Sequence, residues 1–339
     1  MKLRNLITYA VVVPALIMSS CSKDDNEPAK DATASCKECH NSTTKIFAAE
    51  IQWGNSVHAT GGNFERNSAD CAPCHTNEGF NLVVEDQEVP ETVSNPTPVS
   101  CYTCHFIHTS YDASDLALKT TDAVTSVIDD ATIDMGKGNL CAHCHQPRDI
   151  SSSVSPALTA TSTDDVTISS SRFGPHHGPQ SALLAGNSAF AMGAGGTSHA
   201  HYTANADGCV TCHMADAFGS QAGGHTMKME YEYHSAMELN EKGCLATGCH
   251  EGEDQETMMT LVEDFTADFD TLLVQLKTAL TAADLLTSTG SVNTKVTFTA
   301  DQARAVYNYQ FLNEDRSHGV HNPNYAMTLV ENTLAKMQQ

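Results

Sequence analysis

The sequence is poor in aromatic residues, in charged residues and, above all, in basic ones. Phe, Trp and Tyr make up 6% of the 339 residues, and Asp, Glu, Lys and Arg together make up 17%. Such a chain has little material for a large hydrophobic core, so we expect something other than side chains to fill part of its interior. With 18 Lys and Arg against 41 Asp and Glu, the net charge is -23. This argues against nucleic acid as a partner, because such binding depends on basic residues that neutralise phosphates.

Long hydrophobic runs are absent too, except at the N-terminus. There Lys2 and Arg4 flank the start of the apolar stretch LITYAVVVPALIM, and small residues follow it up to Cys21. This order is typical of a signal peptide, here residues 1–20, and the apolar stretch is short for a transmembrane helix. A plain N-terminal membrane anchor is the alternative interpretation.

The residues before Cys21 resemble the lipobox of bacterial lipoproteins. The resemblance implies that Cys21 carries acyl chains, and several such chains hold a protein stably on a membrane. It also implies an exported protein, an outer-membrane lipoprotein that faces the periplasm or the cell surface. Residues 21–35 are polar and show no periodicity, so we expect a flexible tether there.

Cysteine, by contrast, is plentiful and falls in a fixed pattern. Of the thirteen cysteines, ten lie in five copies of C-x-x-C-H. With 17 histidines among 339 residues, a given cysteine pair is followed by His by chance about one time in twenty. The five copies are CKECH at 36–40, CAPCH at 71–75, CYTCH at 101–105, CAHCH at 141–145 and CVTCH at 209–213.

C-x-x-C-H is the attachment site of haem c. The two thiols form thioethers with the two vinyl groups, and the histidine binds the iron from the same side. Zinc sites and disulfides are the competing interpretations. Zinc requires ligands in sets of four, and nothing in the sequence groups the motifs in this way, whereas disulfides do not require the histidines.

The segment CLATGCH, from Cys244 to His250, has two more residues between its cysteines. We expect the loop to absorb them, with Gly248 supplying backbone freedom. Sites with four intervening residues also occur in small multihaem cytochromes, which this segment resembles. If it is counted, the sequence predicts six covalently bound haems, with Cys21 as the only cysteine left over. The haem-binding cysteines are then Cys36, Cys39, Cys71, Cys74, Cys101, Cys104, Cys141, Cys144, Cys209, Cys212, Cys244 and Cys249, and the iron-binding histidines of the motifs are His40, His75, His105, His145, His213 and His250.

Each iron has a second axial position. A second histidine there gives a closed site that passes electrons, whereas an open position admits a substrate. Eleven of the 17 histidines remain once the six motif histidines are set aside, which is enough to close every site.

Several segments resemble the multihaem c-type cytochromes whose haem packing is shared with ammonia-forming nitrite reductases and octahaem reductases. They are SVHAT, CHFIHT, GPHHGPQSALLAG, TSHAHYTANADGCVTCHM, GGHTMKM and DRSHGVHNPNYAMTLVENTL, scattered from about residue 36 to the C-terminus. In that family, histidines in such segments are distal ligands. The resemblance therefore implies His58, His108, His176, His199, His225 and His321 as iron ligands.

Some of these choices have neighbours that could take their place. His177, His201 and His318 are the alternatives to His176, His199 and His321. We expect His143 and His234 to be packing or surface residues. The chain also departs from the nitrite reductases, because no cysteine pair is followed by the lysine that marks their catalytic haem.

The expected fold class is mainly α with extensive loops, a multihaem cytochrome c fold in which haems form the core. We expect a hexahaem domain at 36–250 and a helical segment at 251–339 that carries one distal ligand. In the helical segment, apolar residues recur every three or four positions over 258–286, Thr299 or Asp301 could cap a second helix, and Pro323 lies near the start of a third. The Ser- and Thr-rich run 149–172 is predicted to be a loop. The helices either brace their own chain or form a dimer interface.

These features together predict an electron carrier rather than an enzyme. The expected partners are other cytochromes or redox proteins and, through the lipid, a membrane. Similarity to extracellular cytochromes, some of which stack into filaments, adds a homo-oligomer or filament. One alternative is a multihaem reductase of a small nitrogen or sulfur oxyanion with one open iron. Another is a subunit or electron donor of a reductase that binds through its acidic face.

Overall fold

The computed structural model describes residues 36–339 except 38, 43–44, 61, 197–198 and 247. The expected signal peptide, the lipid-bearing Cys21 and the tether at 21–35 lie outside the described residues. Within the described part, none of the helices combines the length and the apolar character that crossing a bilayer requires.

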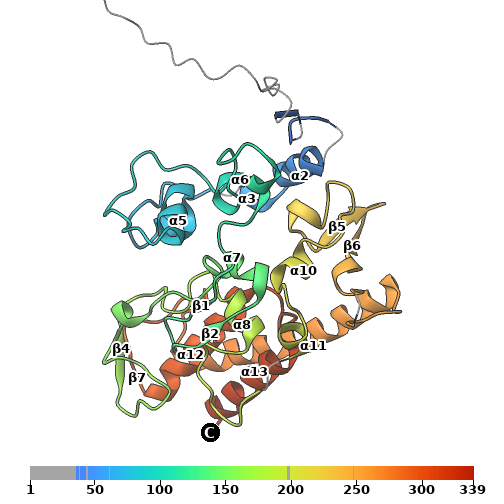
Figure 1. The fold of residues 1–339 in the computed structure, drawn as a ribbon. Coiled ribbons are helices and arrows are strands. Elements are labelled where there is room, and N and C mark those ends of the chain that lie inside the picture. The colour runs from blue at the N-terminus through green and yellow to red at the C-terminus, as the bar shows by residue number, and fades with distance from the viewer. Residues whose placement is uncertain (1–35, 38, 43–44, 61, 197–198, 247) are drawn as a thin grey trace, which may run out of the picture.

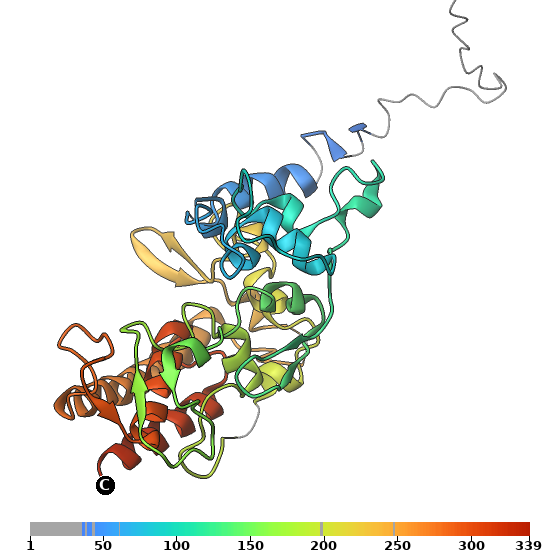
Figure 2. The ribbon, with the colours of Figure 1, turned by 90° about the vertical axis from the view of Figure 1, so that its left-hand side faces the viewer.

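The N-terminal part of the described chain consists of short helices joined by loops. In Figures 1 and 2 these helices lie together at one end of the molecule, far from the C-terminus. They are α2 (Lys45–Gly54), α3 (Val57–Thr60), α4 (Ala72–His75), α5 (Asn77–Val84), α6 (Cys101–Cys104) and the 3-10 turn η1 (Ala113–Leu116).

The middle of the chain is made of single turns of helix and very short strands. The helical turns are η2 (Gly136–Gly138), α7 (Asn139–Ala142), η3 (Ser151–Ser153), α8 (Gln180–Ala185), α9 (Ala200–Thr203), α10 (Cys209–His213), η4 (Gly224–Thr226) and η5 (Glu241–Gly243). The strands are β1 (Val124–Thr125), β2 (Thr132–Ile133), β3 (Val154–Ser155), β4 (Val166–Ile168), β5 (Glu230–Tyr233) and β6 (Ala236–Leu239). Strands β5 and β6 form a hairpin that projects from the molecule in Figure 2.

Three longer elements complete the chain, and they confirm the predicted C-terminal helices. They are α11 (Gln255–Ala282), α12 (Ala300–Asp315) and α13 (Pro323–Met337), with strand β7 (Thr297–Phe298) before α12. Thr299, and not Asp301, caps α12 through a capping box with Gln302. Pro323 opens α13, where its missing N–H is not needed.

A continuous hydrophobic core lies between these helices, α8 and a three-stranded antiparallel sheet ordered β3-β4-β7. Val166 and Ile168 of β4 point into it, and Val166 is paired with Phe298 of β7. Residues on both sides of the expected boundary at 250 therefore share one core. The sequence did not predict this core or the strands within 149–172. The many Ser and Thr residues of this stretch suggested a loop, but Val166 and Ile168 alternate with Thr167 as in a strand. Thr itself also favours strands.

One buried polar side chain fastens this core together. Asn308 of α12 accepts a hydrogen bond from the amide of Phe190 (2.9 Å) and donates to the carbonyl of Phe190 (2.7 Å) and to Thr333 of α13 (3.0 Å). Asn308 and Thr333 have no exposed surface. The loop at Phe190 is thus held to two helices by groups that water cannot replace.

We therefore expect Asn308→Ala to lower the free energy of unfolding by about 3 kcal/mol, since each buried group left without a partner costs about 1–3 kcal/mol. Asn332→Ala is the matched control, because its amide donates to the exposed carbonyl of Ala194, which water can satisfy. Denaturant unfolding followed by far-ultraviolet circular dichroism measures both. Equal losses in the two variants would contradict the assignment.

Candidate functional site

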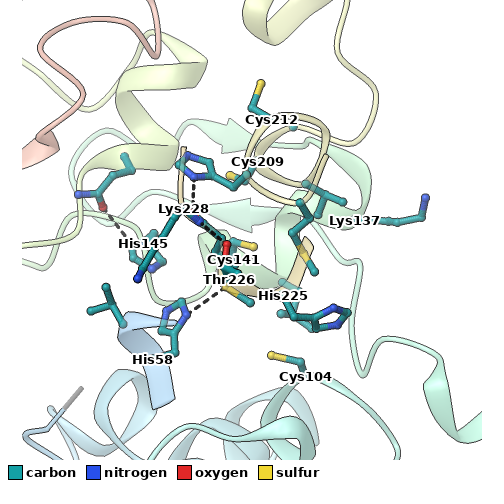
Figure 3. Close-up of a pocket in the computed structure, with 18 of the residues that line it drawn as sticks. His58, Cys104, Lys137, Cys141, His145, Cys209, Cys212, His225, Thr226 and Lys228 are labelled. Carbon is teal, nitrogen blue, oxygen red and sulfur yellow. Dashed lines mark hydrogen bonds between the residues drawn. The ribbon is translucent and has the colours of Figure 1, made fainter. Parts of the chain in front are cut away.

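A single large cavity contains the cysteine motifs. Its volume is about 3870 Å³, several times the roughly 300–1,000 Å³ of a pocket for one small molecule. Cysteines of all six motifs line it, together with the histidines that follow them. In the close-up of Figure 3, thiols from Cys104, Cys141 and Cys209 lie around the same space as the rings of His58 and His145.

Each C-x-x-C-H motif is wound into about one helical turn. In four of the motifs the amide of the closing histidine donates to the carbonyl of the first cysteine, as for His105 and Cys101 at 2.9 Å. Residues i, i+3 and i+4 share one face of a helix. The two thiols and the imidazole therefore point to the same side, which is the geometry that a haem bound at two vinyl groups and at the iron requires.

The longer segment CLATGCH closes in the same way. The amide of His250 donates to the carbonyl of Cys244 at 3.0 Å, although two more residues lie between them than in the other motifs. Gly248 has a φ of +85°, in the left-handed region that glycine favours. The ends of the segment thus keep the hydrogen bond of the shorter motifs in spite of the two extra residues.

Every motif histidine faces a second histidine from elsewhere in the chain. The distance between the two ring centroids is 5.9–6.4 Å in all six pairs. The pairs are His40 with His108, His75 with His176, His105 with His225, His145 with His58, His213 with His321, and His250 with His201.

These distances leave room for one metal atom between the rings, at metal–nitrogen bonds of about 2 Å. Direct packing of two aromatic rings also gives centroid distances of about 4.5–7 Å, so the distance alone does not decide. The membership of the pairs is the more specific observation. Each pair combines one ring from a cysteine motif with one from outside the motifs, which ring packing does not require but two axial ligands of one iron do.

Most of the distal histidines expected from the sequence lie in these pairs. His58, His108, His176, His225 and His321 each face a motif ring. His199 does not, because it caps α9 and its Nδ1 accepts a hydrogen bond from the amide of His201 at 3.2 Å. The ring that faces His250 is that of His201.

The remaining histidines form none of the described ring pairs with a motif histidine. His177 and His318 are exposed and bond through Nδ1 to carboxylates, the first to Glu314 at 2.6 Å and the second to Asp270 at 2.7 Å. His143 packs edge-on against Phe80. His234 is exposed in the turn between β5 and β6. The local sequence does not show these partners, since they come from distant helices.

Hydrogen bonds at Nδ1 fix the orientation of several of the paired rings. Three of them end on backbone carbonyls: His105 on Leu116 (2.7 Å), His201 on Val320 (2.9 Å) and His213 on Met227 (3.0 Å). His145 bonds to the side-chain oxygen of Gln180 (3.1 Å), and His321 to the carboxylate of Asp315 (2.7 Å). A histidine that donates from Nδ1 leaves Nε2 unprotonated and aimed at a metal.

Burial keeps several of these rings neutral. It lowers the pKa of His58 to about 4, with a further contribution from the charge of His145. It also lowers the pKa of His176 to about 4, with His177 adding to the effect. A neutral imidazole has the free lone pair that an iron ligand needs, so both rings are ready to bind metal at neutral pH.

The donor set therefore fits haem c and fits the alternatives poorly. Each site offers two thiols and a ring on one side and a second ring on the other. Among the described residues, no group of three or more His, Cys, Asp or Glu side chains is arranged to hold a metal ion directly. The ten cysteines from Cys71 to Cys249 are all described, and none of them forms a disulfide.

The sites are in contact with one another. The thiol of Cys74 points to the carbonyl of His143 (3.8 Å), and that of Cys144 points to the carbonyl of Pro73 (3.7 Å), so these two motifs interlock. The thiols of Cys141 and Cys209 lie close enough to affect each other's pKa, which lowers that of Cys141 and raises that of Cys209.

The last two motifs also pack closely, and a glycine allows it. A Cβ on Gly243, just before Cys244, would lie 2.6 Å from the Cα of Cys212. The segment CLATGCH can therefore approach α10 only because residue 243 has no side chain.

The segment GGHTMKM ties three sites together. His225 faces His105, while the carbonyl of Met227 accepts from His213. The sulfur of Met227 lies 3.1 Å from Nδ1 of His58. Figure 3 shows this segment between His58, His145 and the thiols of Cys209 and Cys212. One loop thus positions rings of three neighbouring sites.

Comparisons with known proteins agree with this geometry at the level of the fold. No family model and no curated protein matches the chain. Among solved structures, it is similar to the Outer Cell Wall Cytochrome OcwA, with 20% identity and a TM-score of 0.53 over 85% of this chain and 50% of that one. It is also similar to the undecahaem cytochrome from the S-layer of Carboxydothermus ferrireducens, with 18% identity and a TM-score of 0.47 over 84% of this chain and 40% of that one. The chain spans about half the length of OcwA. The likeness to OcwA confirms the predicted cytochrome fold.

Proposed function

We propose that the protein transfers electrons through six covalently bound c-type haems. The observation that carries the proposal is the pairing of all six motif histidines with second histidines at 5.9–6.4 Å. When bound, haem iron supplies one-electron chemistry. The chain itself would supply a histidine on each side of every iron, and hydrogen bonds at Nδ1 orient several of these rings.

The same geometry supports an assignment of residues to each site. The twelve motif cysteines would hold the haems, and the motif histidines would be the proximal ligands. As distal ligands we propose His108, His176, His225, His58, His321 and His201, in the chain order of the motifs that they face, with His201 in place of the expected His199.

The contacts between motifs support a relay. The CAHCH motif contacts CAPCH through Cys144 and CVTCH through Cys141. The thiol of Cys104, from CYTCH, is close enough to Cys141 to affect its own pKa. CAHCH therefore contacts three neighbouring motifs and lies at the centre of the arrangement. Electron transfer between the sites would not require a side chain that performs acid–base chemistry.

The setting of this relay is proposed from the sequence. We propose an exported protein held by the lipid on Cys21 at the outer membrane, between periplasmic redox proteins and an external acceptor or partner. The net charge of -23 suits partners with basic docking surfaces. Assembly of copies into oligomers or filaments belongs to the same proposal, through resemblance to extracellular cytochromes.

A reductase of a small oxyanion is the competing function. It would require an iron with one open face, and each of the six motif rings is instead faced by another ring. The absence of a C-x-x-C-K motif favours the electron carrier as well.

The first test is a haem count together with a carbon monoxide difference spectrum of the reduced holoprotein. We expect six haems per chain from the pyridine haemochrome and no change on adding carbon monoxide, because the gas needs a vacant axial position. A spectral change equal to about one haem in six would show an open iron and would favour the reductase over the electron carrier.

The second test determines whether His201 or His199 is the distal ligand that faces His250. We expect His201→Ala to open one iron, so that carbon monoxide binds to about one haem in six. His199→Ala is the matched control and should leave the spectrum unchanged, because its ring lies at the cap of α9. The opposite result would return His199 to the ligand set.

A further inference from the structure

The site of His213 and His321 differs from the others in the group that accepts the hydrogen bond from Nδ1 of its distal histidine. His321 donates from Nδ1 to the carboxylate of Asp315 at 2.7 Å. Among the paired rings whose Nδ1 partner the structure describes, the others bond to backbone carbonyls, to the amide of Gln180, to the sulfur of Met227 or to the hydroxyl of Tyr102. In the described part of the chain, His321 alone among them has an anionic partner.

Asp315 is held in place for this contact. Its side chain has no exposed surface. Its second oxygen accepts hydrogen bonds from the backbone amide (3.0 Å) and the hydroxyl of Ser317, and that hydroxyl in turn accepts from the amide of His321 (3.2 Å). The carboxylate is therefore fixed relative to the ring on both sides.

The position of Asp315 is costly, which argues for a function. It is buried at the last residue of α12, where the helix dipole disfavours a negative charge. A buried carboxylate also needs a compensating partner. The nearby Arg316 pairs with Glu314 at 3.6 Å, and in the described chain no Lys or Arg forms an ion pair with Asp315. Its polar partners are His321 and Ser317.

A carboxylate behind a ligand histidine makes that histidine a stronger electron donor to the metal. Stronger donation stabilises the oxidised iron, and hydrogen bonds of this kind are among the means by which proteins set haem potentials. We propose that Asp315 is a positioning residue that lowers the reduction potential of the site between His213 and His321 below that of the same site with a neutral partner. The inference rests on the proposed haem function.

The place of this site in the molecule gives the effect a role. Its CVTCH motif contacts CAHCH through Cys209 and the CLATGCH segment through Cys212. The site whose potential Asp315 is proposed to lower therefore lies in contact with both CAHCH and the last segment. Asp315 would in this way control how readily that end of the relay exchanges electrons with the centre.

The test is a spectroelectrochemical titration of the full, haem-loaded chain carrying Asp315→Asn. Asparagine keeps the shape and can still accept the hydrogen bond, but it removes the charge. We expect one of the six potentials to shift upward, with a change in the electron paramagnetic resonance signal of the same low-spin haem, and the other five to stay in place.

Asp270→Asn is the matched control. It removes a carboxylate that also bonds to a histidine at 2.7 Å, but His318 faces no motif ring. No single potential should shift upward in this variant as it does in Asp315→Asn. Equal shifts in the two variants, or no shift in Asp315→Asn, would overturn the inference.

Ser317→Ala keeps the test decisive if Asp315→Asn fails to fold. Loss of the hydroxyl removes a donor from the carboxylate, so Asp315 should bond more strongly to His321 and the same potential should shift downward. An upward shift or none would overturn the inference.

The haem count distinguishes failure of the two proposals. Fewer than six haems in the wild type would contradict the proposed function, whereas six haems without these shifts would contradict only the role of Asp315.

Discussion

The arrangement depends on one constraint, that two imidazoles from distant parts of the chain must meet across a gap of about 6 Å. His58 must reach His145, and His321 must reach His213, with neither pair close in sequence. Hydrophobic collapse cannot provide such precision in a chain with so few aromatics. The N-terminal half accordingly consists of short helices, very short strands and the loops between them.

The hydrophobic core supplies the rigidity that these loops lack. It lies toward the C-terminal end of the chain (Figure 1), and Asp315 at the end of α12 and Pro323 at the start of α13 line the cavity. Gln180 at the start of α8 holds His145 and donates to the carbonyls of Glu314 and Asp315 at the end of α12. The packed helices thus hold the ring of His145 in place through Gln180. Side chains on packed helices are positioned more accurately than side chains on loops.

The sequence predicted the cytochrome fold and the C-terminal helices, because the cysteine motifs and the helical periodicity are local signals. It did not predict the core, since the strands that join residues 154–168 to Phe298 are only two or three residues long. Nor could it decide between neighbouring histidines. His177 is bonded to Glu314 and His318 to Asp270, and both carboxylates lie far away in sequence. His199 caps its own helix. Choices of this kind are made by tertiary contacts.

For the proposed haem function, the packing of the motifs against one another bears on how the cofactors are attached. In the folded chain the hydrogen bond with Cys74, together with burial, raises the pKa of the Cys144 thiol well above its usual value, and burial raises the pKa of Cys104 to about 12. Thiols with raised pKa values are poor nucleophiles. Thioether formation at these cysteines would therefore be easier in the open chain than after the motifs have packed together.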